Sequence, residues 1–253
     1  MGVFRRVLSD GADIGLLVLV VLFMYGLFYA FGSVLSEVHT TYALGLLASP
    51  DPIVSLRGIF LESLSILSDP LVLLSMIIYG VLLLYLSLVV IGWISKRRIS
   101  YPENPFKRAL SVLVPSVILG IIVSAPVFLL FSPVILLSSN VMAVIVFLLV
   151  FFVVLLVYVP VVFPSVVSLV VDSDSVSGAL RNGVLVGRRR WLRIVLYLLG
   201  VSLVSSVILY VFGILSLFFP WAQDFLFVLY QAISFVLPLA VFAEVYIADA
   251  HGE

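Results

Sequence analysis

The sequence predicts an all-α, polytopic membrane protein with six transmembrane helices, one external amphipathic helix and one cytoplasmic amphipathic helix. Three observations carry this prediction. Of the 253 residues, 64% are hydrophobic and 10% are charged, whereas a soluble domain is about 45–50% apolar and about 25% charged. Five long stretches contain no charged residue, and the basic residues gather in alternate connecting segments. This composition excludes soluble enzymes, nucleic-acid-binding proteins and disordered chains.

The uncharged stretches are each long enough for a transmembrane helix, which needs about 20 apolar residues. The stretch 109–171 has 63 residues and must fold back once, most simply where turn-forming residues cluster between Ser132 and Asn140. Unbroken apolar runs such as VIVFLLVFFVVLLVYV lack the alternation of a transmembrane β-strand. The six predicted spans of this single transmembrane domain are 14–36, 70–95, 109–131, 141–165, 191–217 and 225–247. An external segment, 37–69, and cytoplasmic segments 96–108 and 172–190 connect them, together with short external turns.

The distribution of basic residues predicts the orientation, because loops rich in lysine and arginine stay on the cytoplasmic side. Twelve of the 13 basic residues lie at the amino terminus or around the segments 96–108 and 172–190, and Arg57 alone lies in the external segment. We therefore expect a multi-pass protein of the cell membrane with both termini in the cytoplasm.

Two connecting segments show helical periodicity. In the external segment, apolar residues recur at spacings of three and four from Ile53 to Leu67, which predicts a helix lying in the outer headgroup zone or against the bundle. In the cytoplasmic segment, capping residues from Asp172 to Ser175 precede an apolar stripe formed by Val176, Leu180 and Val184. We expect a surface helix whose arginines contact inner-leaflet phosphates and which leads directly into span five.

The stretch from Val176 to Trp191, centred on Ala179-Leu180-Arg181, resembles a recurrent pattern, and Tyr158-Val159-Pro160 upstream fits it as well. The pattern occurs in uncharacterised six-span membrane families related to the membrane domain of some glycerophosphodiester phosphodiesterases. The resemblance covers most of the chain and implies a six-span fold. It implies no phosphodiester hydrolysis, because the catalytic part of those enzymes is a separate soluble domain, for which these 253 residues leave no room.

No set of catalytic residues is evident, and we expect no enzyme, no metal site and no cofactor. His39 and His251 fall on opposite sides of the predicted membrane, and the chain contains no cysteine. The serines of the spans have no lysine or histidine within the membrane to activate them. Two GxxxG matches, Gly11 to Gly15 and Gly183 to Gly187, are expected by chance among 16 glycines.

The leading functional hypothesis is a membrane protein that engages lipid or a partner through its basic cytoplasmic face. The partners would be membrane lipids, above all anionic inner-leaflet headgroups, with a protein partner or a second copy of the chain as further candidates, and no nucleic acid. The predicted contact residues are Lys96, Arg97, Arg98, Lys107, Arg108, Arg181, Arg188, Arg189 and Arg190.

The alternative hypothesis is a carrier or channel for an uncharged or lipid-like solute. Prolines within the spans remove backbone hydrogen bonds, and broken helices build many substrate sites, although proline is also common as a simple kink in membrane helices. The candidate helix breaks are Pro115, Pro126, Pro160, Pro164 and Pro238. The polar groups that would line such a site are Ser116, Ser124, Tyr158, Gln231 and Ser234.

Overall fold

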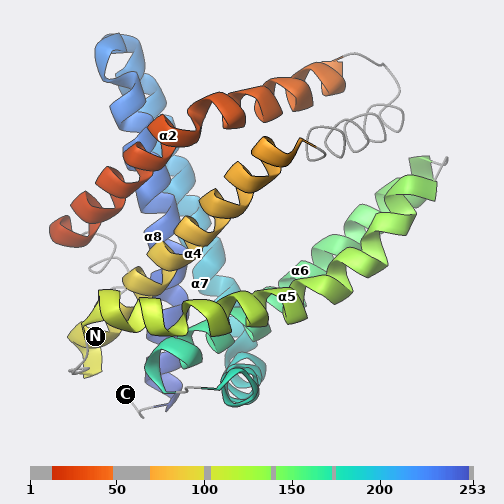
Figure 1. Cartoon of the computed structure of the whole chain (residues 1–253), viewed down its shortest axis with the longest axis vertical. Helices are drawn as coiled ribbons and strands as arrows, with labels where there is room; N and C mark the ends of the chain where they lie inside the picture. Colours follow the sequence, from red (N-terminus) through yellow and green to blue (C-terminus); the bar gives the residue numbers. More distant parts are fainter. Residues whose placement is uncertain (1–12, 48–68, 100–103, 138–140, 173–174, 251–253) are drawn as a thin grey trace. The chain divides into compact units, whose positions relative to one another are not determined.

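The computed structural model describes residues 13–47, 69–99, 104–137, 141–172 and 175–250 (Figure 1). Within these ranges the chain is helical almost throughout and contains no strand. The elements are α2 (Ile14–Leu47), α4 (Pro70–Ile99), α5 (Pro105–Leu137), α6 (Val141–Val171), α7 (Val176–Phe218), the short 3₁₀-helix η1 (Pro220–Ala222) and α8 (Gln223–Ala250).

Six of these helices are long and apolar enough to cross a membrane. The prediction of an all-α chain with six such helices is therefore confirmed, and each predicted span lies inside one helix. The hydrophobicity that a lipid environment demands, together with the internal hydrogen bonding of a helix, explains why uncharged sequence and helical structure coincide so closely.

The helix ends differ from the predicted boundaries. Helix α5 continues to Leu137, so the predicted turn from Ser132 is wrong over its first six residues. The reason is that Pro133 removes one backbone hydrogen bond and leaves the other bonds of the helix in place. Helix α2 continues to Leu47, well into the predicted external segment. The amphipathic helix predicted between Ile53 and Leu67 lies outside the described residues.

The chain divides into two compact units. The first comprises residues 1–26, 84–119 and 157–253, and the second comprises 27–83 and 120–156. In the second unit, the ring of Phe31 on α2 meets the ring of Tyr79 on α4 edge to face, with the centroids 5.8 Å apart. The first unit contains the basic clusters of α4, α5 and α7 and the buried core described next.

The core of the first unit centres on α8. Every residue from Val236 to Ile247 is buried except the half-buried Pro238. A helix that is buried on all sides must be surrounded by other helices, and the core cluster indeed draws side chains from α2, α4, α5, α6 and α7. Helix α7 packs beside α8, and η1 makes the tight connection between them (Figure 1).

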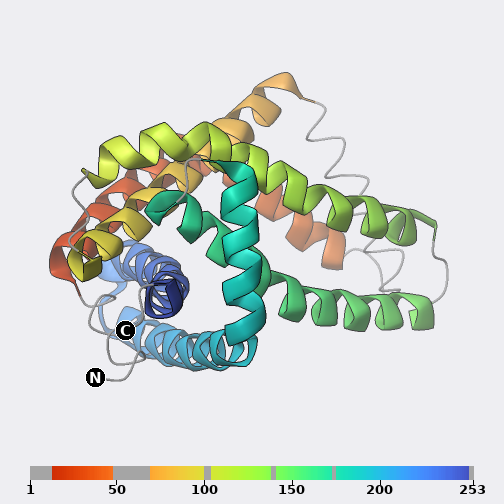
Figure 2. The same cartoon turned by 90° about the horizontal axis from the view of Figure 1, so that it is seen from below.

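Helix α7 changes direction along its length. In Figure 1 its teal amino-terminal part is seen end-on, whereas the light-blue remainder runs upward; Figure 2, turned by 90°, shows the teal part along its length. The helix begins at the predicted capping residues, where the Ser175 hydroxyl accepts a hydrogen bond of 3.2 Å from the amide of Gly178. The predicted cytoplasmic helix and span five are thus two parts of one element.

The apolar stripe noted in the sequence of this first part of α7 is not the face that packs on the core. The stripe of Val176, Leu180 and Val184 is only partly covered, and Val184 is exposed. Small side chains face the core instead, namely Ala179, Gly183, Val186 and Gly187. The cause is a close approach between α7 and α6, since a Cβ atom at Gly183 would overlap the backbone of Ser165. The GxxxG match at Gly183 therefore lies at a close helix contact.

Candidate functional site

Polar side chains from all six long helices are linked at one end of the first unit. We call this set the polar cluster; it consists of Asp13, Arg97, Arg98, Arg108, Asp172, Arg190, Glu244, Tyr246 and Asp249. Its members make five contacts between helices, described in turn below.

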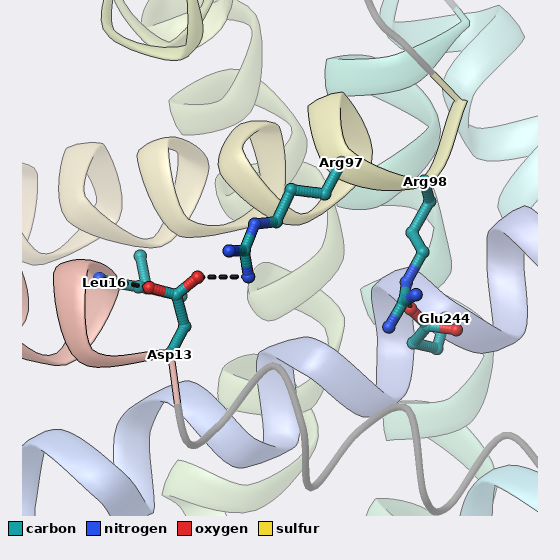
Figure 3. Close-up of polar contacts among 5 residues, drawn as sticks. All are labelled: Asp13, Leu16, Arg97, Arg98 and Glu244. Carbon is teal, nitrogen blue, oxygen red and sulfur yellow. Dashed lines mark hydrogen bonds and ion pairs between the residues drawn. The ribbon is translucent and has the colours of Figure 1, made fainter.

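Asp13 connects α2 to α4. One of its carboxylate oxygens, Oδ1, accepts a hydrogen bond of 3.0 Å from the amide of Leu16 and so caps the first turn of α2. The other oxygen forms an ion pair with the guanidinium of Arg97 (Figure 3). An acidic residue at the start of a helix is also stabilised by the helix dipole. Asp13 therefore fixes the position of this helix end relative to α4.

Arg98, the next residue of α4, connects to α8. Its Nε lies 2.5 Å from Oε1 of Glu244, whose side chain is only 2% exposed, while that of Arg98 is 23% exposed (Figure 3). A buried carboxylate is tolerated when an opposite charge and hydrogen bonds compensate its lost hydration. No role for Glu244 is predicted from the sequence, although an acidic residue near the end of an otherwise apolar helix suggests a basic partner.

Arg108 connects α5 to α6. Its Nε donates to the carbonyl of Val170 at 3.0 Å, and its terminal nitrogen donates to the carbonyl of Leu169 at 3.3 Å. The last carbonyls of a helix have no partner inside the helix, and a cation there also complements the helix dipole. Just beyond α6, Asp172 accepts a hydrogen bond of 2.7 Å from the hydroxyl of the buried Tyr246 on α8.

Asp249 connects α8 to α7. Its Oδ1 lies 2.6 Å from Nε of Arg190, and its Oδ2 lies 3.8 Å from a terminal nitrogen of Arg189. The carboxylate is largely buried, Arg190 is partly buried, and Arg189 is 70% exposed. Arg190 is therefore the closer, better-shielded partner.

The nine basic residues predicted to contact lipid or a partner separate into two groups. Four of them hold helices together as described above, namely Arg97, Arg98, Arg108 and Arg190. The remaining five, which point to solvent, are Lys96, Lys107, Arg181, Arg188 and Arg189. Among the described residues, only Arg189 of these five makes an ion pair, and that contact is long.

The outward face of the first part of α7 combines arginine with apolar side chains. Arg181, Leu185, Arg188 and Leu192 follow one another at spacings of four, three and four, which places them on one side of the helix. All four are exposed, and Val184 beside them is exposed as well. This face, which we call the α7 face, lies opposite the small residues that pack on α6.

The five prolines do not end a helix. Pro160 and Pro164 lie inside α6, Pro238 lies inside α8, and α5 is helical at both Pro115 and Pro126. They remain positions at which a backbone carbonyl loses its usual donor.

The polar groups predicted near these prolines differ in their surroundings. Ser124 and Gln231 are exposed. The hydroxyl oxygens of Ser116, Tyr158 and Ser234 are buried and have no hydrogen-bond partner among the described residues. Unpartnered hydroxyls inside a packed structure are uncommon and call for an explanation.

Within the described parts of the chain, no group of three or more histidine, aspartate or glutamate residues could hold a metal ion. No protein-family model, no curated protein and no solved structure matches the chain. The resemblance to six-span families therefore stays a prediction, and any function has to be argued from the geometry above.

Proposed function

We propose that this chain is a non-enzymatic, multi-pass protein of the cell membrane that binds anionic headgroups of the inner leaflet through its basic surface. The observation that carries the proposal is the α7 face, on which Arg181, Leu185, Arg188 and Leu192 are exposed together on a helix segment that runs across the rest of α7 (Figure 2).

The chemistry of the α7 face suits a membrane interface. Leucine side chains enter the boundary between headgroups and acyl chains, and arginine side chains extend from the same depth to the phosphates. Each basic residue near an anionic leaflet contributes about 1 kcal/mol to association, and salt weakens this attraction.

The length of α7 supports the same placement. It has 43 residues and is therefore about 65 Å long at about 1.5 Å per residue, whereas the hydrocarbon layer is about 30 Å thick. If the second part of α7 crosses the bilayer, the first part lies outside the hydrocarbon. Its change of direction then lays it along the surface on the side where twelve of the 13 basic residues are expected.

The proposal can be tested by measuring the composition of the lipid shell around the protein. The purified protein is reconstituted into mixed anionic and zwitterionic bilayers, and the anionic enrichment of its first lipid shell is measured with spin-labelled lipids. The variant Arg181→Glu/Arg188→Glu should lose most of this enrichment. The control Arg193→Glu makes the same type of charge change on α7 but off this face. Equal enrichment in the double variant and the parent protein would overturn the proposal, and a protein partner or a second copy would then be the better occupant.

The orientation has its own test, because the chain has no cysteine. Single cysteines are introduced at Ser55, Asn104, Ser139, Ser177 and Gln223, and sealed cells are treated with an impermeant maleimide. Labelling should occur at Ser55, Ser139 and Gln223 only. Reaction at Asn104 or Ser177 would contradict a cytoplasmic location of the basic surface.

A second candidate function is transport of an uncharged or lipid-like solute, favoured by the three unpartnered hydroxyls. A buried hydroxyl without a partner costs about 1–3 kcal/mol, so a ligand or water that completes its hydrogen bonds would be stabilising. Ser116 lies 11 residues after the start of α5, and Tyr158 lies 13 residues before the end of α6, so both are well inside their helices. Pro238, four residues after Ser234, also leaves the carbonyl of Ser234 without its helical donor.

Flux assays in proteoliposomes test this second function. If a solute is transported, Ser116→Ala/Ser234→Ala should slow its flux, whereas Ser206→Ala should not. Ser206 is a suitable control because its hydroxyl is exposed and bonds to the carbonyl of Ser202 at 2.9 Å. Absence of flux across a broad panel of uncharged solutes and lipids would leave no support for transport.

A further inference from the structure

A groove separates the end of α4 from the start of α5 in the first unit. It has a volume of about 490 Å³ and is lined by Trp93, Lys96, Arg97, Asn104, Pro105 and Phe106. Its size is within the range of small-molecule sites, which is about 300–1,000 Å³. None of the roles described above accounts for its two aromatic residues.

The helices position the two walls of the groove. Lys96 and Arg97 follow Trp93 by three and four residues, so both lie next to it on the surface of α4. The two helices approach each other closely at the base, where a Cβ atom at Gly92 would lie 3.3 Å from Cβ of Pro105. This approach brings the aromatic ring of Phe106 to the same groove as Trp93.

The start of α5 forms part of the wall of the groove, through Asn104, Pro105 and Phe106. Asn104 caps the helix, with its Oδ1 accepting from the amide of Phe106 at 3.0 Å and its carbonyl accepting from the amide of Arg108 at 3.0 Å. The positive end of the helix dipole therefore lies beside the side chains of Lys96 and Arg97.

The described side chains that line the groove carry a net positive charge. Arg97 shares its charge with Asp13 and is still 53% exposed. Lys96 is exposed and makes no ion pair with any described residue. An anion is thus favoured at one end of the groove, and the rings of Trp93 and Phe106 provide an apolar surface next to it.

We propose that this groove binds one anionic phospholipid molecule, with its phosphate at Lys96, Arg97 and the start of α5 and its acyl chains against Trp93 and Phe106. The inference rests on the proposed function, because it requires the basic surface to face the inner leaflet. It goes further by assigning a single, saturable lipid site, distinct from the many exchanging contacts of the α7 face.

Trp93 makes the site directly observable. The chain has three tryptophans, so replacing Trp191 and Trp221 by phenylalanine leaves Trp93 as the only tryptophan, which is excited selectively at wavelengths that tyrosine does not absorb. This protein is titrated in micelles with brominated phosphatidylglycerol or brominated phosphatidylcholine, and quenching of Trp93 is recorded. Quenching should saturate with the anionic lipid at a lower concentration than with the zwitterionic lipid.

A matched pair of lysines tests the phosphate contact. Lys96→Gln removes a charge from the groove and should raise the half-quenching concentration of phosphatidylglycerol about fivefold. Lys107→Gln removes a charge that is also exposed and lies next to Phe106 but outside the groove, and it should leave the half-quenching concentration unchanged. Both positions are exposed, so neither variant should impair folding, which the elution profile in detergent verifies.

Three outcomes would overturn the inference. These are equal quenching by both lipids, equal behaviour of the two lysine variants, and displacement of the lipid by inorganic phosphate at the same concentration. The last would identify a phosphate site to which acyl chains contribute nothing. Failure here is distinguishable from failure of the proposed function, because the lipid shell measured with the Arg181 and Arg188 variants does not depend on the groove.

Discussion

Replacing Arg98 should destabilise the protein more than replacing any exposed basic residue of the same helix. The substitution Arg98→Met keeps an unbranched, flexible side chain and removes the ion-pair partner of Glu244. Because the Glu244 side chain is 2% exposed, water cannot substitute for the guanidinium. Removing one partner of a buried ion pair typically costs about 3–5 kcal/mol, which corresponds to a decrease of about two to three and a half orders of magnitude in the folding equilibrium constant.

The two partners should not be equivalent. Arg98 is 23% exposed, so its charge can still be hydrated when Glu244→Gln removes the carboxylate. We therefore expect a smaller loss for Glu244→Gln than for Arg98→Met. Replacing both residues together, as Arg98→Met/Glu244→Met, should recover most of the loss, since an apolar pair of similar volume often replaces a buried ion pair at little cost.

Unfolding by sodium dodecyl sulfate in mixed micelles, followed by circular dichroism, measures these differences. Lys96→Met is the control, because it makes the same substitution on the same helix at an exposed position. The reasoning would be refuted if Arg98→Met and Lys96→Met were equally stable. It would also be refuted if the double variant were less stable than Arg98→Met alone.

Two further changes test the packing of α7 and α8. Gly183→Ala places a methyl group against the backbone of Ser165 and should lower the free energy of unfolding by about 1–3 kcal/mol. Gly213→Ala, with nothing within 4 Å of the added Cβ, should be neutral or slightly stabilising. The same unfolding assay measures both variants, and equal effects would contradict the close contact at Gly183. Tyr246→Phe removes the hydrogen bond of 2.7 Å to Asp172 and should cost about 1–3 kcal/mol in that assay. An unchanged unfolding midpoint would show that this bond contributes nothing to stability.

The helices themselves could be predicted because lipid imposes a simple requirement on sequence. A span must be uncharged for about 20 residues, and each of the six predicted spans lies within one helix. The ends of the helices could not be predicted in the same way. Nothing about an apolar span requires the helix to stop at the membrane surface, and α2 continues to Leu47 and α5 to Leu137.

The polar cluster could be predicted only in part. Counting basic residues by segment indicates the side of the membrane on which they lie, but it does not indicate which residue each of them contacts. Arg97 and Arg98 are neighbours in sequence, yet successive helical residues point about 100° apart, so one meets Asp13 and the other meets Glu244. Which helices stand in those two directions depends on the packing of the whole unit. The presence of an acidic residue at the matching end of α2 and α8 was the available signal.

The packed face of α7 could not be predicted from the sequence for a different reason. Periodicity indicated the larger residues Val176, Leu180 and Val184, because large apolar side chains usually mark the buried face. At Gly183 the neighbouring backbone comes so close that only a hydrogen atom fits, so the buried face is the one that carries the small side chains. A hydropathy pattern does not distinguish these two modes of packing.

Helix α8 is translated after the five helices around it, and it brings polar partners for residues on or next to three of them. Glu244 and Asp249 bind arginines of α4 and α7, and Tyr246 binds Asp172 after α6. A nascent chain that has not yet inserted α8 therefore holds Arg98 and Arg190 without these carboxylates. Completion of the fold is tied to the arrival of this segment, and a polypeptide truncated before it should be degraded by membrane proteases that recognise unassembled helices.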